Sequence, residues 1–225
     1  MKCVCFTGHR PDKLYGYDYN NSKYIDLLES VKNIIFDLDS KYEYKTFISG
    51  GCIGFDFIAF EAVNKLNYEN RRGLTNNVAI PFKGQELRWK DNDKAIYNHI
   101  LETADNVIKV DDEYGYITDD NIRSRKYAKY YMRNKYMVDN SDMVIACWNG
   151  DCIGGTWNTV RYAMNNNKII ICINPEDLSI KVFKDGKWKK LNRAMMNINN
   201  KITKIISRNG EVWFKIKKVG GLCIL

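Results

Sequence analysis

Two glycine-rich turns, each set between an apolar run and a helical pattern, constrain this chain more than any other feature. The turns are SGGCIGFD, residues 49–56, and WNGDCIGG, residues 148–155. Each follows a short apolar run, KTFIS or MVIAC, and MVIAC is typical of a parallel strand that is covered on both faces. Glycine lets the backbone turn sharply and approach a ligand, while free N–H groups at a helix start attract anions. The pattern therefore predicts an α/β fold with two turns able to hold phosphate.

Apolar runs alternate with helical patterns along residues 1–175. The expected strands are residues 2–8, 45–49, 76–82, 105–110, 143–147 and 168–175. Residues 22–39 carry apolar side chains at helical spacing, with Ser22 as a candidate N-cap. Strands that alternate with helices indicate a doubly wound, mostly parallel sheet. We expect residues 1–175 to form one main domain.

The last fifty residues, 176–225, follow a different pattern. They are strongly basic and contain a DG turn at 185–186 and an NG turn at 209–210, between apolar and basic residues. Such turns predict hairpins, or a helix followed by a hairpin, in a small C-terminal extension. This extension is a candidate contact for nucleic acid, another partner or a second subunit.

Charge and cysteine content limit the class of protein. A net charge of +8, from 35 basic and 27 acidic residues spread along the chain, suits a phosphorylated ligand or nucleic acid and selects neither. Seven cysteines without paired CxxC motifs, and only two histidines, argue against a disulfide framework and a zinc site, so we expect no metal and no resident cofactor. No run approaches the roughly 20 apolar residues that span a bilayer, and MKCVCFTGHR lacks a secretory core. We expect a cytoplasmic protein without a membrane partner.

The candidate binding residues lie where the expected strands end. The first strand ends at Gly8 and is followed by His9 and Arg10, on a loop at the edge where open α/β sheets bind ligands. The turn at 49–56 adds Ser49, Gly50, Gly51, Gly54 and Asp56. The carboxylate of this aspartate, in the first helical turn, either contacts a ribose or base or simply stabilises the helix dipole.

The second turn adds Gly154, Gly155 and Thr156. The hydroxyl of this threonine, at the expected N-cap, either caps the helix or bonds a phosphate. Arg133, near the end of the preceding helix, is placed to counter the same negative charge. Trp89 either stacks on a base or covers its loop.

From about residue 121 a basic helix begins in which arginines and lysines alternate with tyrosines. Basic and aromatic residues interleaved in this way can grip single-stranded nucleic acid. The alternative, which we prefer, is a solvated helix face with one end at a small-ligand phosphate.

Five segments, taken in order, resemble the YspA/YpsA-like branch of the SLOG superfamily, which also includes the LOG phosphoribohydrolases and the DNA-processing protein DprA (Smf). The segments are FTGHRP, SGGCIGFD, IPF with GQELRW, RNKYMVDNSD and GGTWNTVRYA, and they lie within residues 1–175. The resemblance implies a Rossmann-like fold that binds a nucleotide or nucleotide-derived ligand, with phosphate at the GGT turn. A homodimer or higher homo-oligomer is also expected.

The same resemblance bears on catalysis. In LOG enzymes an arginine and a glutamate carry out hydrolysis of an N-glycosidic bond; Arg133 matches the arginine motif, whereas neutral Asn158 and Thr159 lie where the glutamate is expected. A neutral side chain cannot act as a carboxylate does, so Asp56 is the remaining candidate acid. Binding of a nucleotide or nucleotide-derived ligand is our leading hypothesis, with signalling nucleotides among the candidates and Asn158 among the contacts. The alternatives are a phosphoribohydrolase acting on a nucleoside monophosphate and a single-stranded DNA-binding protein.

Overall fold

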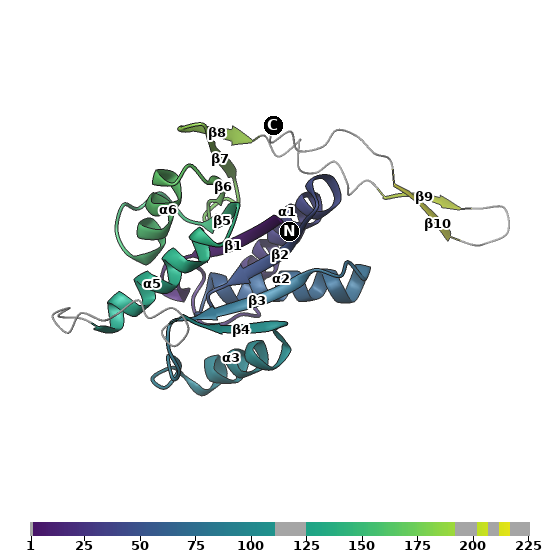
Figure 1. Ribbon diagram of the computed structural model, residues 1–225. Coiled ribbons are helices and arrows are strands. Elements are labelled where there is room, and N and C mark those ends of the chain that lie inside the picture. Colours follow the sequence, from purple (N-terminus) through teal and green to yellow (C-terminus); the bar gives the residue numbers. More distant parts are fainter. Residues whose placement is uncertain (1, 111–124, 192–201, 207–211, 217–225) are drawn as a thin grey trace.

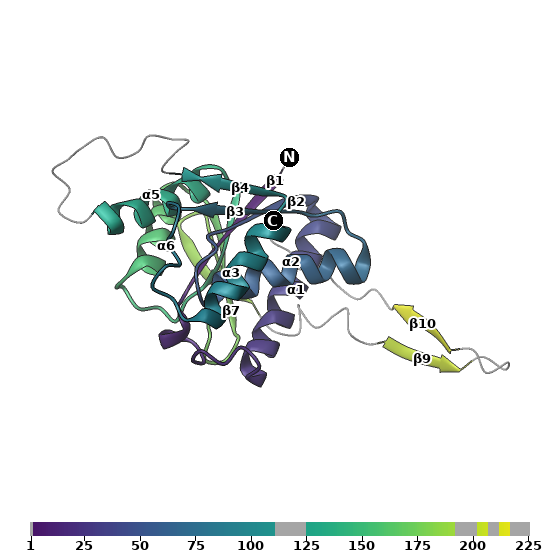
Figure 2. The same ribbon diagram turned by 90° about the horizontal axis from the view of Figure 1, so that it is seen from below.

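The computed structural model describes residues 2–110, 125–191, 202–206 and 212–216, and shows an eight-stranded sheet flanked by helices (Figures 1 and 2). The strand order is β4-β3-β2-β1-β5-β6-β7-β8. The strands of this sheet are β1 (Lys2–Gly8), β2 (Tyr44–Ser49), β3 (Thr75–Ile80), β4 (Asn106–Lys109), β5 (Met143–Cys147), β6 (Ile169–Ile173), β7 (Ile180–Lys184) and β8 (Lys187–Leu191). The helices are the short 3-10 turn η1 (Pro11–Lys13), α1 (Ser22–Tyr42), α2 (Phe55–Asn70), α3 (Asp91–Thr103), α5 (Arg125–Asp139) and α6 (Gly155–Asn165).

The first six strands are parallel, and the chain changes direction between β1 and β5. It builds β1 to β4 outward on one side and then returns to place β5 against the other side of β1. This confirms the predicted doubly wound, mostly parallel, Rossmann-like sheet. In such sheets a crevice opens at the carboxyl ends of the two strands where the order reverses. The fold therefore directs the loops after β1 and β5 toward one another.

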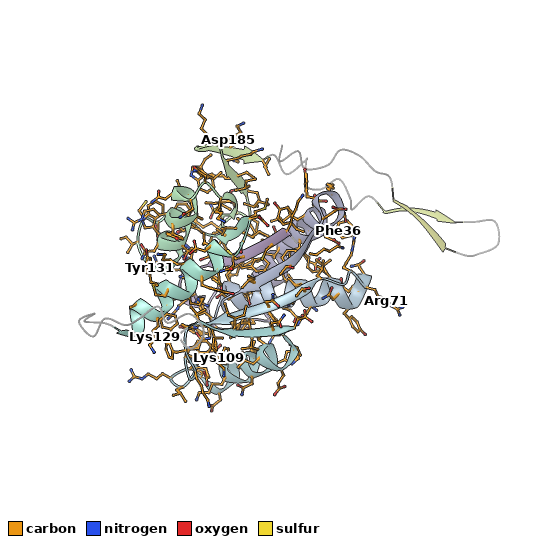
Figure 3. All side chains as sticks on the ribbon, in the orientation of Figure 1. Phe36, Arg71, Lys109, Lys129, Tyr131 and Asp185 are labelled. Carbon is orange, nitrogen blue, oxygen red and sulfur yellow. The ribbon has the colours of Figure 1, made fainter. Side chains whose placement is uncertain are left out.

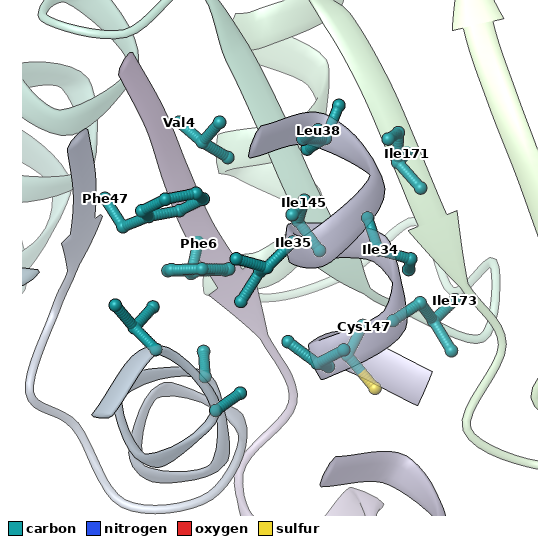
Figure 4. Close-up of a cluster of buried hydrophobic side chains, with 14 of the residues drawn as sticks. Val4, Phe6, Ile34, Ile35, Leu38, Phe47, Ile145, Cys147, Ile171 and Ile173 are labelled. Carbon is teal, nitrogen blue, oxygen red and sulfur yellow. The ribbon is translucent and has the colours of Figure 1, made fainter. Parts of the chain in front are cut away.

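Helices cover both faces of the sheet, which explains the continuous apolar runs in β1 and β5. On one face α1 and α2 pack against alternate strand residues; Figure 4 shows Ile34, Ile35 and Leu38 of α1 over the central strands. On the other face α5 and α6 contribute Met137, Val138, Val160 and Ala163. Burying both faces in this way favours strands that are apolar at every position.

The first long helix differs from its prediction at both ends. Asn21, and not Ser22, is the N-cap, because the Asn21 side chain accepts a hydrogen bond from the backbone N–H of Lys23 at 3.0 Å. Asparagine and serine cap helices about equally well, so the sequence alone did not separate the two neighbours. The helix then runs to Tyr42 and ends where Glu43 adopts a left-handed conformation.

The predicted DG hairpin is present and belongs to the main sheet. Asp185 and Gly186 have φ values of 52° and 74°, as a tight two-residue hairpin turn requires. Strand β7 pairs antiparallel with β6, and β8 pairs with β7, so the sheet continues past residue 175. Asp185 marks the tip of this hairpin, at the opposite end of the sheet from α3 (Figures 1 and 3).

Two further strands, β9 (Ile202–Ile206) and β10 (Val212–Ile216), form a separate antiparallel pair. The NG turn expected between them lies outside the described residues. The division into 1–175 and 176–225 stays a prediction. Among the described helices, none has the length and apolar character needed to cross a membrane.

Candidate functional site

A cavity of about 340 Å³ lies at the carboxyl ends of β1 and β5. Its walls come from the loop after β1, the start of α2, α5 and the start of α6. It is lined by Phe6, Thr7, Gly8, His9, Arg10, Asp12, Lys13, Cys52, Ile53, Asp56, Tyr130, Arg133, Asn134, Met137, Ile153, Gly154, Gly155 and Thr156. The two glycine turns therefore reach one common crevice, as the sequence predicts.

A second cavity, of about 800 Å³, adjoins the first. The two share Arg10, Tyr130, Asn134, Gly154 and Gly155 as lining residues. The second is also lined by Gln85, Arg88, Trp89, Tyr131 and Asn158. We refer to the pair of cavities as the crevice; its first part is narrow and charged, and its second part is wide and aromatic.

The loop after β1 is held in place by its backbone. The His9 N–H donates to the carbonyl of Cys147 at 3.2 Å, and the His9 carbonyl accepts from the N–H of Phe55 at 3.1 Å. Gly8 has no room for a side chain, because a Cβ would lie 2.5 Å from the Phe55 side chain. One short segment thus joins β5 to the start of α2.

The His9 ring is buried beside the other glycine turn. Its Nε2 lies 2.8 Å from Oδ1 of Asn149 and 3.2 Å from the backbone nitrogen of the same residue. Burial lowers the pKa of His9 below its ordinary value of 6.5, so the ring is neutral at neutral pH. Its contacts indicate that it positions the loop that follows β5.

Arg10 is an exposed cation that lines both parts of the crevice. Its guanidinium carbon lies 5.8 Å from the centre of the Tyr130 ring, and the residue lines both cavities. Lys13, the other lysine or arginine on this loop, is paired with Asp151 at 2.9 Å. Arg10 is therefore available to meet an anion that enters from solvent.

Arg133 lines the first cavity although it is only 4% exposed. Its Nη1 donates to the carbonyls of Gly50 and Ala79, and lies 3.8 Å from Oδ2 of Asp56. The same carboxylate oxygen accepts the backbone N–H of Cys52 at 3.2 Å. Burial raises the pKa of Asp56, although the positive charge of Arg133 and the Cys52 N–H act in the opposite direction. These two catalytic candidates form a buried ion pair at the edge of the cavity.

The space beside the first glycine turn is filled by side chains of the protein. Ser49 is fully buried, and its Oγ has no hydrogen-bond partner within the described part of the chain. A Cβ on Gly50 would lie 1.8 Å from Nη1 of Arg133, and one on Gly51 would lie 2.8 Å from the side chain of Val78. The structure does not bring these three residues to the cavity surface; Cys52 and Ile53, which the sequence reasoning missed, line it instead.

The start of α2 already has partners for its first backbone N–H and for its helix dipole within the protein. Gly54, the N-cap residue, has φ 97°, and a Cβ there would lie 2.6 Å from the carbonyl oxygen of His9. The first N–H of the helix, from Phe55, already donates to that carbonyl, while Asp56 stands in the first turn. An acid in the first turn stabilises a helix through its dipole, so this terminus has little attraction left for a second anion.

The start of α6 is open. Gly154 is the N-cap residue with φ 92°, Gly155 is the first helical residue, and a Cβ built on either would have no neighbour within 4 Å. Thr156 is therefore the second helical residue and not the N-cap, which corrects the prediction. Gly154, the second glycine of WNGDCIGG, takes the capping position, because positive φ suits glycine and disfavours threonine. Thr156 lines the cavity, whereas the hydroxyl of Thr159, one turn later, donates to the Gly155 carbonyl at 2.9 Å.

Trp89 and Asn158 lie in the wide part of the crevice. The indole of Trp89 packs edge-on against Tyr97 and Phe57, with ring centroids 5.3 and 6.1 Å apart. Tyr130 and Tyr131 complete the aromatic wall, and Tyr131 is labelled beside α5 in Figure 3. The interleaved tyrosines of this helix were the sequence signal for that wall. Among the described residues, no group of three or more His, Cys, Asp or Glu side chains is placed to hold a metal ion.

Comparison with known proteins identifies the family of this chain. Residues 4–178 match the family model described as the YspA SLOG family. The uncharacterized SPbeta prophage-derived protein YoqJ of Bacillus subtilis (strain 168) is 31% identical over 144 residues, which span 64% of this chain and 83% of YoqJ. A UPF0398 protein of Bacillus cereus (strain ATCC 14579) is 25% identical over 174 residues, which span 75% of this chain and 86% of that protein.

Among solved structures, the X-ray structure of DNA processing protein A (DprA) from Streptococcus pneumoniae is similar with a TM-score of 0.49 and 18% identity. The match covers 77% of this chain and 50% of the DprA chain. The family match extends over most of the sheet and over both glycine turns, so this chain belongs to the YspA SLOG family.

Proposed function

We propose that the crevice binds a nucleotide or nucleotide-derived ligand, with its phosphate at the start of α6. The observation that carries the proposal is the difference between the two helix starts. At α2 the first N–H and the dipole are already satisfied by His9 and Asp56. At α6 there is no side-chain cap, no acidic residue in the first turn and open space beside Gly154 and Gly155. The first N–H groups of a helix need partners, and an anion supplies them.

The remaining contacts suit the other parts of such a ligand. Arg10, exposed between the two cavities, is placed to bond the same phosphate, since a guanidinium can donate two parallel hydrogen bonds. The wide cavity beyond it presents Trp89, Tyr130 and Tyr131, which offer ring faces or edges to a planar base. A volume of about 800 Å³ lies within the range of roughly 300–1,000 Å³ found for small-molecule sites.

Thermal unfolding in the presence of AMP, ADP, cyclic AMP and NAD⁺ tests the proposal. A ligand at a hundred times its Kd should stabilise the folded protein by about 2.7 kcal/mol. Arg10→Gln should raise the Kd of that ligand about tenfold or more, because it removes a charge-assisted hydrogen bond. Arg161→Gln removes the same charge from an exposed position on α6 that does not line the crevice, and should leave the binding unchanged.

The proposal fails if none of these compounds, nor ADP-ribose, raises the melting temperature. It also fails if a compound that does so acts equally on the wild type and on Arg10→Gln.

Hydrolysis of an N-glycosidic bond is the second candidate, and Asp56 is the observation that favours it. Its carboxyl group lines the cavity, and burial raises its pKa, as is found for carboxyl groups that act as general acids. Chromatography of AMP after incubation with wild type and with Asp56→Asn tests this activity. Release of adenine by the wild type alone would support it, whereas intact AMP at high protein concentration would exclude it for this substrate.

Binding of single-stranded DNA and formation of a homo-oligomer stay predictions. Of the described basic residues of α5, Arg133 is buried, and Lys135 lies 5.1 Å from the centre of the Tyr162 ring. A gel-shift affinity that falls steeply as salt is raised would support DNA binding.

A further inference from the structure

A third cavity, of about 270 Å³, lies beside the β7–β8 hairpin and shares no lining residue with the crevice. We call it the β8 pocket. Its walls include Trp148, Asn149, Asn174, Ser179, Lys181 and Trp188. The nucleotide proposal makes no use of these side chains.

Strand register explains how this pocket forms. Phe183 pairs with Trp188, Lys181 pairs with Lys190, and Lys181 also pairs with Cys172 of β6. Directly paired residues in a sheet share a face, so Trp188, Lys181 and Lys190 all lie on the face covered by α5 and α6. Since α6 does not extend over β8, Trp148 from the loop after β5 forms the other wall.

The two indoles form an aromatic wall. Trp148 stacks on Trp157 with ring centroids 5.5 Å apart and an interplanar angle of 20°. It meets Trp188 at 6.3 Å and 42°, and Trp188 is backed by Phe183 at 5.3 Å. The Trp148 Nε1 donates to the carbonyl of Asp151 at 2.8 Å, which fixes its ring orientation. Rings held on one side by other rings leave apolar surface that a further planar ring can cover.

The charges beside this wall have no counter-ion among the described residues. Lys181 and Lys190 are directly opposite each other on antiparallel strands, an arrangement that destabilises a sheet when nothing balances it. Within the described residues neither lysine forms an ion pair. An anion in the β8 pocket would relieve this repulsion, and polar groups of Asn174 and Ser179 are at hand to donate hydrogen bonds to it.

We infer that the β8 pocket is a second ligand site, which binds a small aromatic carboxylate with its ring against Trp148 and Trp188 and its carboxylate at Lys181. The volume of about 270 Å³ is just below the range of drug-sized sites and suits a single ring. This site does not depend on the nucleotide proposal, because no wall is shared.

Tryptophan indole N–H signals in ¹H–¹⁵N NMR spectra of the full chain provide the test, with benzoate as the probe. The signals of Trp148 and Trp188, assigned with Trp148→Phe and Trp188→Phe, should shift in a saturable way, while the Trp89 signal in the crevice should not. Lys181→Gln should raise the Kd of benzoate about fivefold. Lys189→Gln, on the opposite face of β8, should have no effect.

Neutral benzamide should bind more weakly than benzoate, and acetate should leave both signals unmoved. The inference is overturned if benzoate moves neither signal, if it moves them without saturation, or if Trp89 responds in their place. Equal weakening by Lys181→Gln and Lys189→Gln would also overturn it, because the effect would then reflect net charge alone.

Discussion

Replacing Gly50 with alanine should destabilise the protein by about 3 kcal/mol, because the new methyl group would displace the buried Asp56–Arg133 pair. The backbone of Gly50 does not require glycine, since its φ is not positive. The cost comes from space: the new Cβ would lie 1.8 Å from Nη1 of Arg133, against an ordinary contact of at least 3.4 Å. Nη1 must therefore move by about 1.6 Å, which breaks its hydrogen bonds to Gly50 and Ala79.

The magnitude follows from what this movement leaves behind. Asp56 and Arg133 have side chains that are 9% and 5% exposed, so neither charge can turn to water. Breaking a buried pair costs about 3–5 kcal/mol, and we take the lower end because the two groups are 3.8 Å apart. For a chain of this size, a loss of about 3 kcal/mol lowers the melting temperature by about 6–12 °C.

Gly155→Ala is the matched control, and urea unfolding followed by tryptophan fluorescence is the assay. This glycine also has no positive φ, and a Cβ on it meets nothing within 4 Å. Gly155→Ala should therefore change the free energy of unfolding by less than about 0.5 kcal/mol. Its methyl group should, however, weaken the binding of a phosphate at the start of α6. A Gly50→Ala protein as stable as this control would refute the argument that Arg133 fills the space beside the first turn.

Three further predictions concern protonation and thiol chemistry. Because the pKa of Asp56 in the folded protein is raised above 3.8, the folded state retains a proton that the unfolded state loses as the pH rises above 3.8. The free energy of unfolding should therefore fall as the pH rises from 3.8 to the pKa of the folded state. Asp56→Asn should make the midpoint of urea unfolding less dependent on pH in this range. The pKa of His9 is lowered, so stability should instead fall as the pH drops below 6.5, and His9→Gln should remove this component; an NMR titration of the His9 ring should give a midpoint under 6.5. Exposed Cys152 should react with iodoacetamide in the folded protein and buried Cys52 only on unfolding, as mass spectrometry of the labelled peptides will show; rapid labelling of Cys52 would contradict its burial.

The sequence was sufficient for the six parallel strands of the sheet and for the meeting of the two glycine turns. Both follow from local patterns, since a buried parallel strand is apolar throughout and a turn with positive φ needs glycine. Gly54 and Gly154 show this directly, with φ values of 97° and 92° at the two helix starts. The crevice followed because parallel strands present their carboxyl ends at one edge.

What the sequence could not show is which partner each turn already has. The SGG and IGG motifs look alike in the sequence, but their glycines have different neighbours in the structure. Gly50 lies against Arg133, which is 83 residues later in the chain, whereas a Cβ on Gly155 would face open space. Ser49 and Thr156 likewise differ only in tertiary surroundings: the first is fully buried and the second lines the cavity. Assigning phosphate contacts from glycine turns alone therefore overcounts them.

The two glycine turns differ in function because the first is filled by protein side chains and the second is open. At α2 the protein supplies its own anion, Asp56, and its own cation, Arg133, so the charges on this side of the crevice are already paired. At α6 the first turn has no acidic residue and Arg10 lines the same cavity, so under the proposed function the ligand supplies the anion. A ligand should therefore gain most of its electrostatic attraction from α6 and Arg10, while changes at α2 should act on stability first and on affinity only through the shape of the wall.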